Sequence, residues 1–276
     1  MSPRSIGAVA WHFPIVAALE KVLLPGLLAL LVACDSEFSR NAALGNGPDT
    51  LRIALSADIR TTEPGVLRDG NTDDVLIHVI EPLVTYREDL TVTPLLLSSW
   101  AVAEDGLSYL LHLREDVRFH NGQLLTPELV VWNFERYLNP ETGWLCLRIF
   151  DGSRGLKIER VTQESERVVR IELNQRDSAF MHKLANTQCN LGIVHPDSLD
   201  PGGNWRSPVG TGPYQLSRWK QGEFVELQRH PFYRPLPDPR DGLGGSREPL
   251  VEHLRWVVVP EASAMRAGLL SGQLDV

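Results

Sequence analysis

Alternation of apolar and polar side chains is clearest between positions 107 and 113. Apolar residues fall at every second position, at Leu107, Tyr109, Leu111 and Leu113, which is the period of a strand with one buried face. An Asp-Gly pair stands just before them, and such a pair favours the positive φ angles of a tight hairpin turn. The pattern predicts a hairpin with strands over residues 100–104 and 107–114, and with Gly106 at positive φ.

A helical period replaces this alternation after position 126. The apolar residues at helical spacing are Val130, Phe134, Tyr137 and Leu138. Before them stands Thr126-Pro127-Glu128, which offers a capping hydroxyl, a proline where no N–H partner is needed, and an acid in the first turn. We therefore expect a helix that begins after Thr126 and ends before the proline at position 140.

The remaining periodic segments predict a mixed α/β fold. Strands are expected over residues 51–56, 157–161, 168–173, 214–219, 224–228 and 254–259. Helices are expected over residues 73–80, capped by Asn71 or Thr72, and over 178–185 and 261–271. Residues 273–276 begin an element that the sequence does not finish. Hairpins with helices between them are typical of mixed α/β domains.

The N-terminal segment is predicted to be a targeting signal and not part of the folded domain. Residues 22–33 form an apolar run after Lys21, too short for a membrane span but suited to a secretory signal. Its end, LVAC at residues 31–34, resembles the bacterial lipobox, in which the cysteine thiol carries the lipid. We expect a signal peptide over residues 1–33, lipidation of Cys34, and a tether over residues 34–49. The alternative, an uncleaved anchor including residues 6–19, would place Glu20 and Lys21 inside the membrane.

Charge and cysteine content exclude several classes of protein. The chain has 27 Lys and Arg against 35 Asp and Glu, a formal net charge of −8, so a nucleic-acid partner is not expected. Its three cysteines include no CxxC pair and no Cys/His cluster, so a structural zinc site is not expected either. Cys146 and Cys189 could form a disulfide outside the cytoplasm, but we favour two buried free thiols.

No arrangement of residues typical of catalysis occurs in the sequence. A GxSxG nucleophile elbow, an SxxK motif and an HExxH zinc motif are all absent. The segment GTGP at residues 210–213 lacks the lysine of a phosphate loop, and its proline removes an N–H donor, so we interpret it as a rigid turn. We expect neither an enzyme nor a bound metal or cofactor.

Several segments in order resemble a known family. They are EPLV at 81–84, WAVAEDGLSY at 100–109, LREDVRFHNG at 113–122, PVGTGPY at 208–214 and GQLDV at 272–276. Together they resemble the extracellular solute-binding proteins of family 5, the peptide- and nickel-type receptors of ABC importers. The resemblance covers residues 50–276. It implies a type II periplasmic-binding-protein-like α/β fold, of which this sequence holds the first lobe. It also implies an inserted α+β subdomain at about residues 84–206, with the second lobe missing.

The resemblance also suggests two residues of the ligand cleft. Glu63 stands where relatives carry Asp-Pro after the first strand, and Trp144 stands where the nickel-binding branch places a cleft tryptophan. Trp144 has a second interpretation, as part of the lobe core. Arginines that would pair with a chelator are absent from residues 141–143 and 188–191, so a nickel chelate is disfavoured.

The resemblance implies a monomeric lipoprotein outside the cytoplasm, held to the membrane by its lipid. It would capture a peptide or similar small polar solute and deliver it to ABC permease subunits. Two alternatives remain from the sequence: a solute sensor without transport, and a truncated fragment without function.

Overall fold

The computed structural model describes residues 49–189 and 191–276, so the expected signal peptide, Cys34 and nearly all of the tether lie outside the described residues. One sheet is formed by the two ends of this described part. It has the order β1 (Thr50–Leu55), β12 (His253–Val258), β11 (Phe224–Arg229) and β10 (Tyr214–Lys220). Strands β1 and β12 are parallel, and the other pairs are antiparallel.

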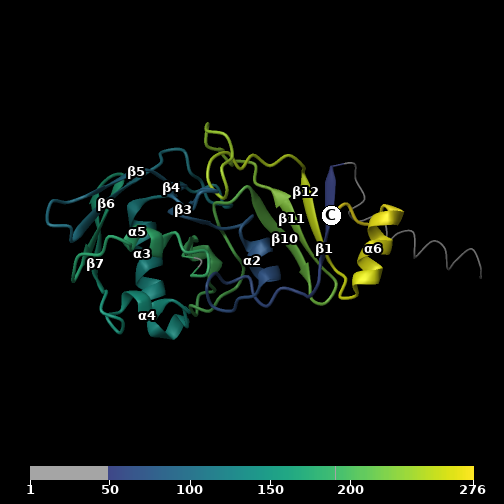
Figure 1. Cartoon of the computed structure of the whole chain (residues 1–276), viewed down its shortest axis with the longest axis horizontal. Helices are drawn as coiled ribbons and strands as arrows, with labels where there is room; N and C mark the ends of the chain where they lie inside the picture. The colour runs from purple at the N-terminus through teal and green to yellow at the C-terminus, as the bar shows by residue number, and fades with distance from the viewer. Residues whose placement is uncertain (1–48, 190) are drawn as a thin grey trace, which may run out of the picture. The chain divides into compact units, whose positions relative to one another are not determined.

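Two helices accompany this sheet. They are α2 (Gly70–Leu76) and α6 (Ala262–Ser271), and the sheet lies between them in Figure 1. Apolar residues of α2 pack with the sheet in one buried cluster that includes Val75, Leu76, Leu227 and Leu254. In helix α6, by contrast, Gly268 is the one residue that is buried within the described part of the chain.

A second sheet is formed by the middle of the chain. Its order is β5 (Leu97–Val102), β6 (Ser108–Leu113), β8 (Val168–Leu173) and β7 (Ile158–Ser165), antiparallel throughout. Helices α3 (Pro127–Leu138), α4 (Leu147–Phe150) and α5 (Phe180–Leu184) lie beside it in Figure 1. Their apolar side chains share a buried cluster with this sheet, the larger of the two clusters in the described part.

Short elements connect the two sheets. Two-stranded ladders pair β2 (Glu81–Pro82) with β9 (Gly192–Ile193), and β3 (Val84–Tyr86) with β4 (Val92–Pro94). Single 3-10 turns are η1 (Pro140–Thr142) and η2 (Pro196–Ser198).

The two best-marked elements of the sequence are confirmed. Gly106 has φ +68° in the turn between β5 and β6, and Tyr109, Leu111 and Leu113 are buried on one face of β6. Helix α3 begins at Pro127, and the Thr126 hydroxyl accepts a hydrogen bond from the Leu129 N–H at 3.4 Å. Local turn and capping chemistry therefore determine these boundaries.

The expected limits of α2 are wrong. The helix begins at Gly70 because the Asp69 carboxylate, and not Asn71 or Thr72, accepts the hydrogen bond of the capping position, from the Thr72 N–H at 2.9 Å. It ends at Leu76, four residues before the expected end at position 80. The carbonyls of His78 and Val79 instead accept hydrogen bonds from the backbone N–H groups of Tyr214 and Gly212, each at 3.0 Å.

The GTGP segment is a packed turn, as its proline suggests. A β-carbon at Gly210 would lie 2.2 Å from the Val79 carbonyl oxygen, so only glycine fits there. The Thr211 hydroxyl donates to the buried carboxylate of Glu81 at 3.1 Å, which ties the turn to β2. Burial raises the pKa of Glu81, and the nearby Arg247 guanidinium, 3.3 Å away, opposes this rise.

The C-terminal residues lie beside β1. The Asp275 N–H donates to the Arg52 carbonyl at 2.8 Å, and the Ala54 N–H donates to the Val276 carbonyl at 2.9 Å. The Asp275 carboxylate also accepts from the Arg52 backbone N–H and guanidinium. Residues 275 and 276 are thus hydrogen-bonded alongside β1, without forming a strand of the first sheet.

Candidate functional site

A cavity of about 650 Å³ lies where three segments of the described chain meet. Glu63 comes from the loop after β1, a group of side chains comes from the C-terminal half of α3 and the turn that follows, and Trp205 comes from the loop after η2. The α3 group is Trp132, Glu135, Arg136, Asn139 and Glu141. Carboxylates, amides, a guanidinium and indoles together make a polar wall with aromatic faces, which is suited to a small polar molecule.

Glu63 and Arg136, which both line the cavity, form an ion pair. Their side chains are 19% and 10% exposed, so water screens the pair only in part. Burial raises the pKa of Glu63 above its ordinary value, and the charge and hydrogen bond of Arg136 oppose that rise. The structure places Glu63, a site residue predicted from the sequence, on the cavity wall. Its contact with a solute remains a prediction.

Arg136 also belongs to this wall, of which the sequence predicted only Glu63. Its guanidinium carbon lies 5.4 Å from the Trp205 ring centroid and 5.6 Å from that of Tyr137, both within cation–π range. The Trp205 indole N–H donates to the Thr62 hydroxyl at 2.9 Å, which fixes the ring. Among the described residues, no partner reaches Arg136 Nη1, although this atom is buried.

A signal for Arg136 was present in the sequence. The residue lies four positions after Trp132 in the helix that the sequence predicts after Thr126, so both side chains share one face of that helix. Residues 141–143 and 188–191, where the family resemblance would place such arginines, contain none. The structure shows that a guanidinium reaches this region from the preceding helix instead.

The outer part of the wall is negatively charged. Glu135 and Glu141 line the cavity, and neither forms an ion pair within the part of the chain that the structure describes. Glu135 lies in the last turn of α3 and Glu141 in η1, and the C-terminal end of α3 adds the negative end of a helix dipole. Because Arg136 is already paired with Glu63, the wall as a whole favours a positively charged group.

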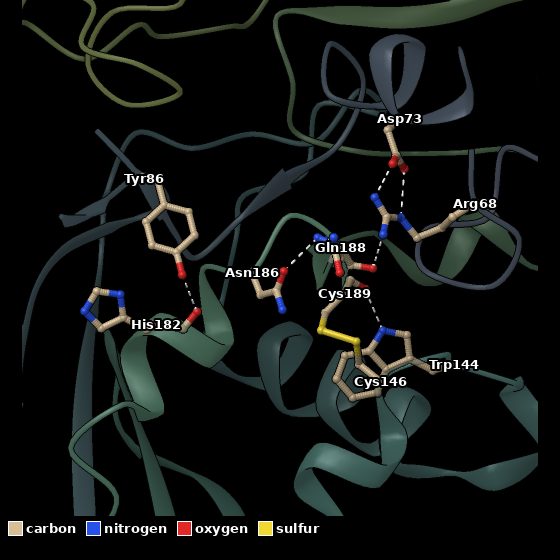
Figure 2. The surroundings of a disulfide bond; sticks show 9 residues. All are labelled: Arg68, Asp73, Tyr86, Trp144, Cys146, His182, Asn186, Gln188 and Cys189. Atoms are coloured by element: carbon tan, nitrogen blue, oxygen red, sulfur yellow. Dashed lines mark hydrogen bonds and ion pairs between the residues drawn. A yellow bond between two sulfur atoms is a disulfide. The ribbon is translucent and has the colours of Figure 1, made fainter. Parts of the chain in front are cut away.

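Trp144 lies behind this wall, in the core. Its side chain is 4% exposed, stacks on Phe150 with ring centroids 5.5 Å apart, and donates its indole N–H to the Cys189 carbonyl at 2.7 Å. Figure 2 shows the indole directed at this carbonyl. Of the two interpretations that the sequence left open, burial in this structure matches the lobe core, and Trp144 is not among the residues that line the cavity.

Cys146 and Cys189 form a disulfide, so the expectation of two free thiols is wrong (Figure 2). Their α-carbons are 5.3 Å apart although 43 positions separate them in the sequence. The reason is tertiary, because the loop after α5 packs against the start of α4. That proximity cannot be derived from cysteine spacing.

Two further observations concern metals and membranes. The described residues contain no group of three or more His, Cys, Asp or Glu side chains placed to hold a metal ion. Within residues 49–189 and 191–276, no helix has the length and apolar character needed to cross a bilayer.

Comparison with known proteins shows the family. The family model "Bacterial extracellular solute-binding proteins, family 5 Middle" matches residues 91–276. The glutathione-binding protein GsiB of Salmonella typhi is 26% identical over 80% of this chain. The probable ABC transporter periplasmic-binding protein SapA of Escherichia coli is 32% identical over 66% of this chain. The chain spans 40% and 37% of the lengths of these two relatives.

The solved structures agree with the sequence comparison. NikZ from Campylobacter jejuni, solved in complex with Ni(L-His), has a TM-score of 0.67 and 26% identity, covering 83% of this chain and 43% of NikZ. The expected fold is confirmed as the α/β fold of family 5 periplasmic binding proteins, of which this chain corresponds to part, the first lobe. The family is one of extracellular solute-binding proteins, and SapA is described as a probable periplasmic-binding protein of an ABC transporter. The chain belongs to the bacterial extracellular solute-binding proteins of family 5.

Proposed function

We propose that this chain forms the first-lobe wall of the solute site in a substrate-binding lipoprotein of an ABC importer. It captures a peptide or similar small polar solute outside the cytoplasmic membrane and delivers it to the permease subunits. The cavity of about 650 Å³ bounded by Glu63, Arg136 and Trp205 is the observation that carries this proposal. Its polar and aromatic wall suits a solute that is held on several sides, as in two-lobed receptors.

The charge of the wall favours one class of solute. Glu135 and Glu141 have no ion-pair partner among the described residues, while the charge of Arg136 is used by Glu63. A free amino group would be attracted to this surface, and a solute rich in carboxylates would be repelled. A peptide with a free N-terminus fits, and a carboxylate-rich nickel chelate does not.

Glu63 and Trp144, the two site residues expected from the sequence, have different roles in the proposed site. Glu63 contacts the solute or shapes its position through Arg136. Trp144 supports the wall from behind, because it is buried beneath the loop that carries Glu63. We also propose that the inserted subdomain spans about residues 84–206 and that the protein acts as a monomer.

Two features support a location outside the cytoplasmic membrane. Cys34 ends an apolar signal-like run, and we propose that it becomes the acylated N-terminus, which holds the protein to the membrane. The Cys146–Cys189 disulfide supports an oxidising compartment, since disulfides rarely persist in the cytosol.

Titration monitored by ¹⁵N NMR tests the solute site. The protein from Asp35 onward is titrated with trialanine and with N-acetyl-trialanine, and the indole N–H signals of Trp132 and Trp205 are followed. Because the chain spans only about 40% of its relatives' length, we expect weak binding, at about millimolar concentration. Trialanine should shift both signals at lower concentration than its acetylated form. A protein that responds to neither peptide would contradict the proposed site.

A further inference from the structure

We infer that the Cys146–Cys189 disulfide positions the Glu63–Arg136 pair, so that solute binding at the cavity wall depends on this bond. The inference rests on the proposed function, because it concerns the same cavity. Neither cysteine lines that cavity, so the effect passes through the loop that carries Glu63.

The disulfide joins two segments that both contact this loop. On one side, the Leu145 N–H donates to the Gly65 carbonyl at 3.0 Å. On the other, the Arg68 guanidinium donates to the Gln188 carbonyl at 2.5 Å and pairs with Asp73. Figure 2 shows the Arg68 guanidinium between the Asp73 carboxylate and the Gln188 carbonyl. The loop over residues 63–68 is therefore held by both partners of one covalent link.

Gly65 leaves no space between the loop and the linked segments. It has φ +72°, and a β-carbon there would lie 2.6 Å from both the Cys189 carbonyl oxygen and Trp144 Cδ1. The loop backbone thus lies directly on the hydrogen bond between Trp144 and Cys189. Packed groups at such short range transmit a shift instead of absorbing it.

From Gly65 the connection to the cavity is short. Glu63 is two residues away, and its backbone N–H donates to the Thr61 hydroxyl at 3.0 Å, which closes a tight turn. Its carboxylate pairs with Arg136. A second route exists through α3, because the Trp144 ring lies 5.1 Å from the ring of Tyr137, the neighbour of Arg136. Movement of Cys189 would therefore reach the ion pair from two sides.

Without the disulfide, we expect the remaining contacts to be enough to fold the protein but to hold the loop over residues 63–68 less firmly. Without the disulfide, the hydrogen bond from the Trp144 indole N–H to the Cys189 carbonyl remains between Trp144 and the segment after α5. The rest of the buried cluster around Phe150 and Phe180 does not involve the loop. We expect a folded protein in which residues 63–68 adopt several conformations.

The test is a double substitution, Cys146→Ser with Cys189→Ser, studied by NMR without ligand and then with trialanine. Without ligand, the Glu63 carboxyl ¹³C signal is titrated with pH, and the Trp205 indole N–H signal is recorded. We expect the Glu63 titration to move toward that of a free glutamate, and the Trp205 signal to broaden or shift. With trialanine, we expect binding to weaken about fivefold or more, because the wall must be ordered on binding.

Asp275→Ala is the matched control. It removes the ion pair with Arg52 of β1, and Asp275 neither belongs to the loop nor lines the cavity. It should reduce stability while leaving the Glu63 titration, the Trp205 signal and trialanine binding unchanged. A general loss of stability cannot then explain a change at the wall.

Gly65→Ala keeps the inference testable if the double-serine protein does not fold. The new methyl group would push the loop away from Cys189 with the disulfide intact, and should reproduce the changes at Glu63 and Trp205. Unchanged Glu63 and Trp205 signals in a folded double-serine protein, or in Gly65→Ala, would overturn the inference. Altered signals without trialanine binding by the parent protein would leave the positioning intact and contradict the proposed function instead.

Discussion

His78 makes the described part of the chain sensitive to acid. Its ring lies between two aromatic side chains, with centroids 5.8 Å from Trp256 and 6.2 Å from Tyr214. Burial, together with the positive charges of Arg247 and Arg240, lowers the pKa of His78 from 6.5 to about 4. The folded protein therefore holds this imidazole neutral at a pH where the unfolded chain binds a proton.

The sign and size of the effect follow from this difference. Between about pH 6.5 and pH 4 the unfolded state binds more protons at His78 than the folded state, so stability falls as the pH falls. The full difference in pKa corresponds to about 3 kcal/mol, and about 2 kcal/mol of it is lost by about pH 5. The ring is only partly shielded from solvent, which weakens the penalty. We therefore expect about 1–2 kcal/mol from this residue.

Urea unfolding at about pH 8 and about pH 5 measures the effect, with His78→Phe as the comparison. Phenylalanine keeps a ring against Trp256 and Tyr214 but cannot bind a proton. Loss of stability on acidification should be smaller in His78→Phe than in the parent protein by the amount given above. His120, whose pKa burial lowers to about 3, remains in both proteins and does not affect the difference. If both proteins lose the same free energy of unfolding between the two pH values, the reasoning about His78 is wrong.

Two further predictions concern the hairpin and the N-terminus. Gly106→Val should lower the free energy of unfolding by about 1–2 kcal/mol, because Gly106 has φ +68° and valine is strained there. Gly106→Asn should cost less, since asparagine tolerates this region, and equal urea midpoints for all three proteins would contradict the assignment. Mass spectrometry of the protein from its native bacterium should find a lipid-bearing Cys34 at the N-terminus. A mature chain that begins upstream, or a Cys34 without lipid, would refute the lipoprotein proposal.

Elements that depend on neighbouring residues were predictable from the sequence. The β5–β6 hairpin and the start of α3 each follow from a few adjacent side chains, Asp105-Gly106 and Thr126-Pro127. The start of α2 was misjudged because several adjacent residues could cap it. The choice of Asp69 depends on where the chain arrives from β1.

The candidate site was predictable only in part. Glu63 was found through the family resemblance, and it lines the cavity. Arg136 was missed because a helical side chain reaches a cavity according to how the helix packs, and the sequence pattern shows only which positions share a face. Its ion pair with Glu63 joins residues from two segments that no local rule connects.

The sequence by itself determined the local elements, the acidic charge and, through ordered motifs, the family. Those properties depend on residues near one another in the chain or on a pattern along it. Only the tertiary structure decided that Cys146 meets Cys189, that Trp144 lies beneath Gly65, and that residues 275 and 276 hydrogen-bond to β1. Each of these contacts joins segments far apart in sequence, and it is stable only because the packed cores hold both segments in place.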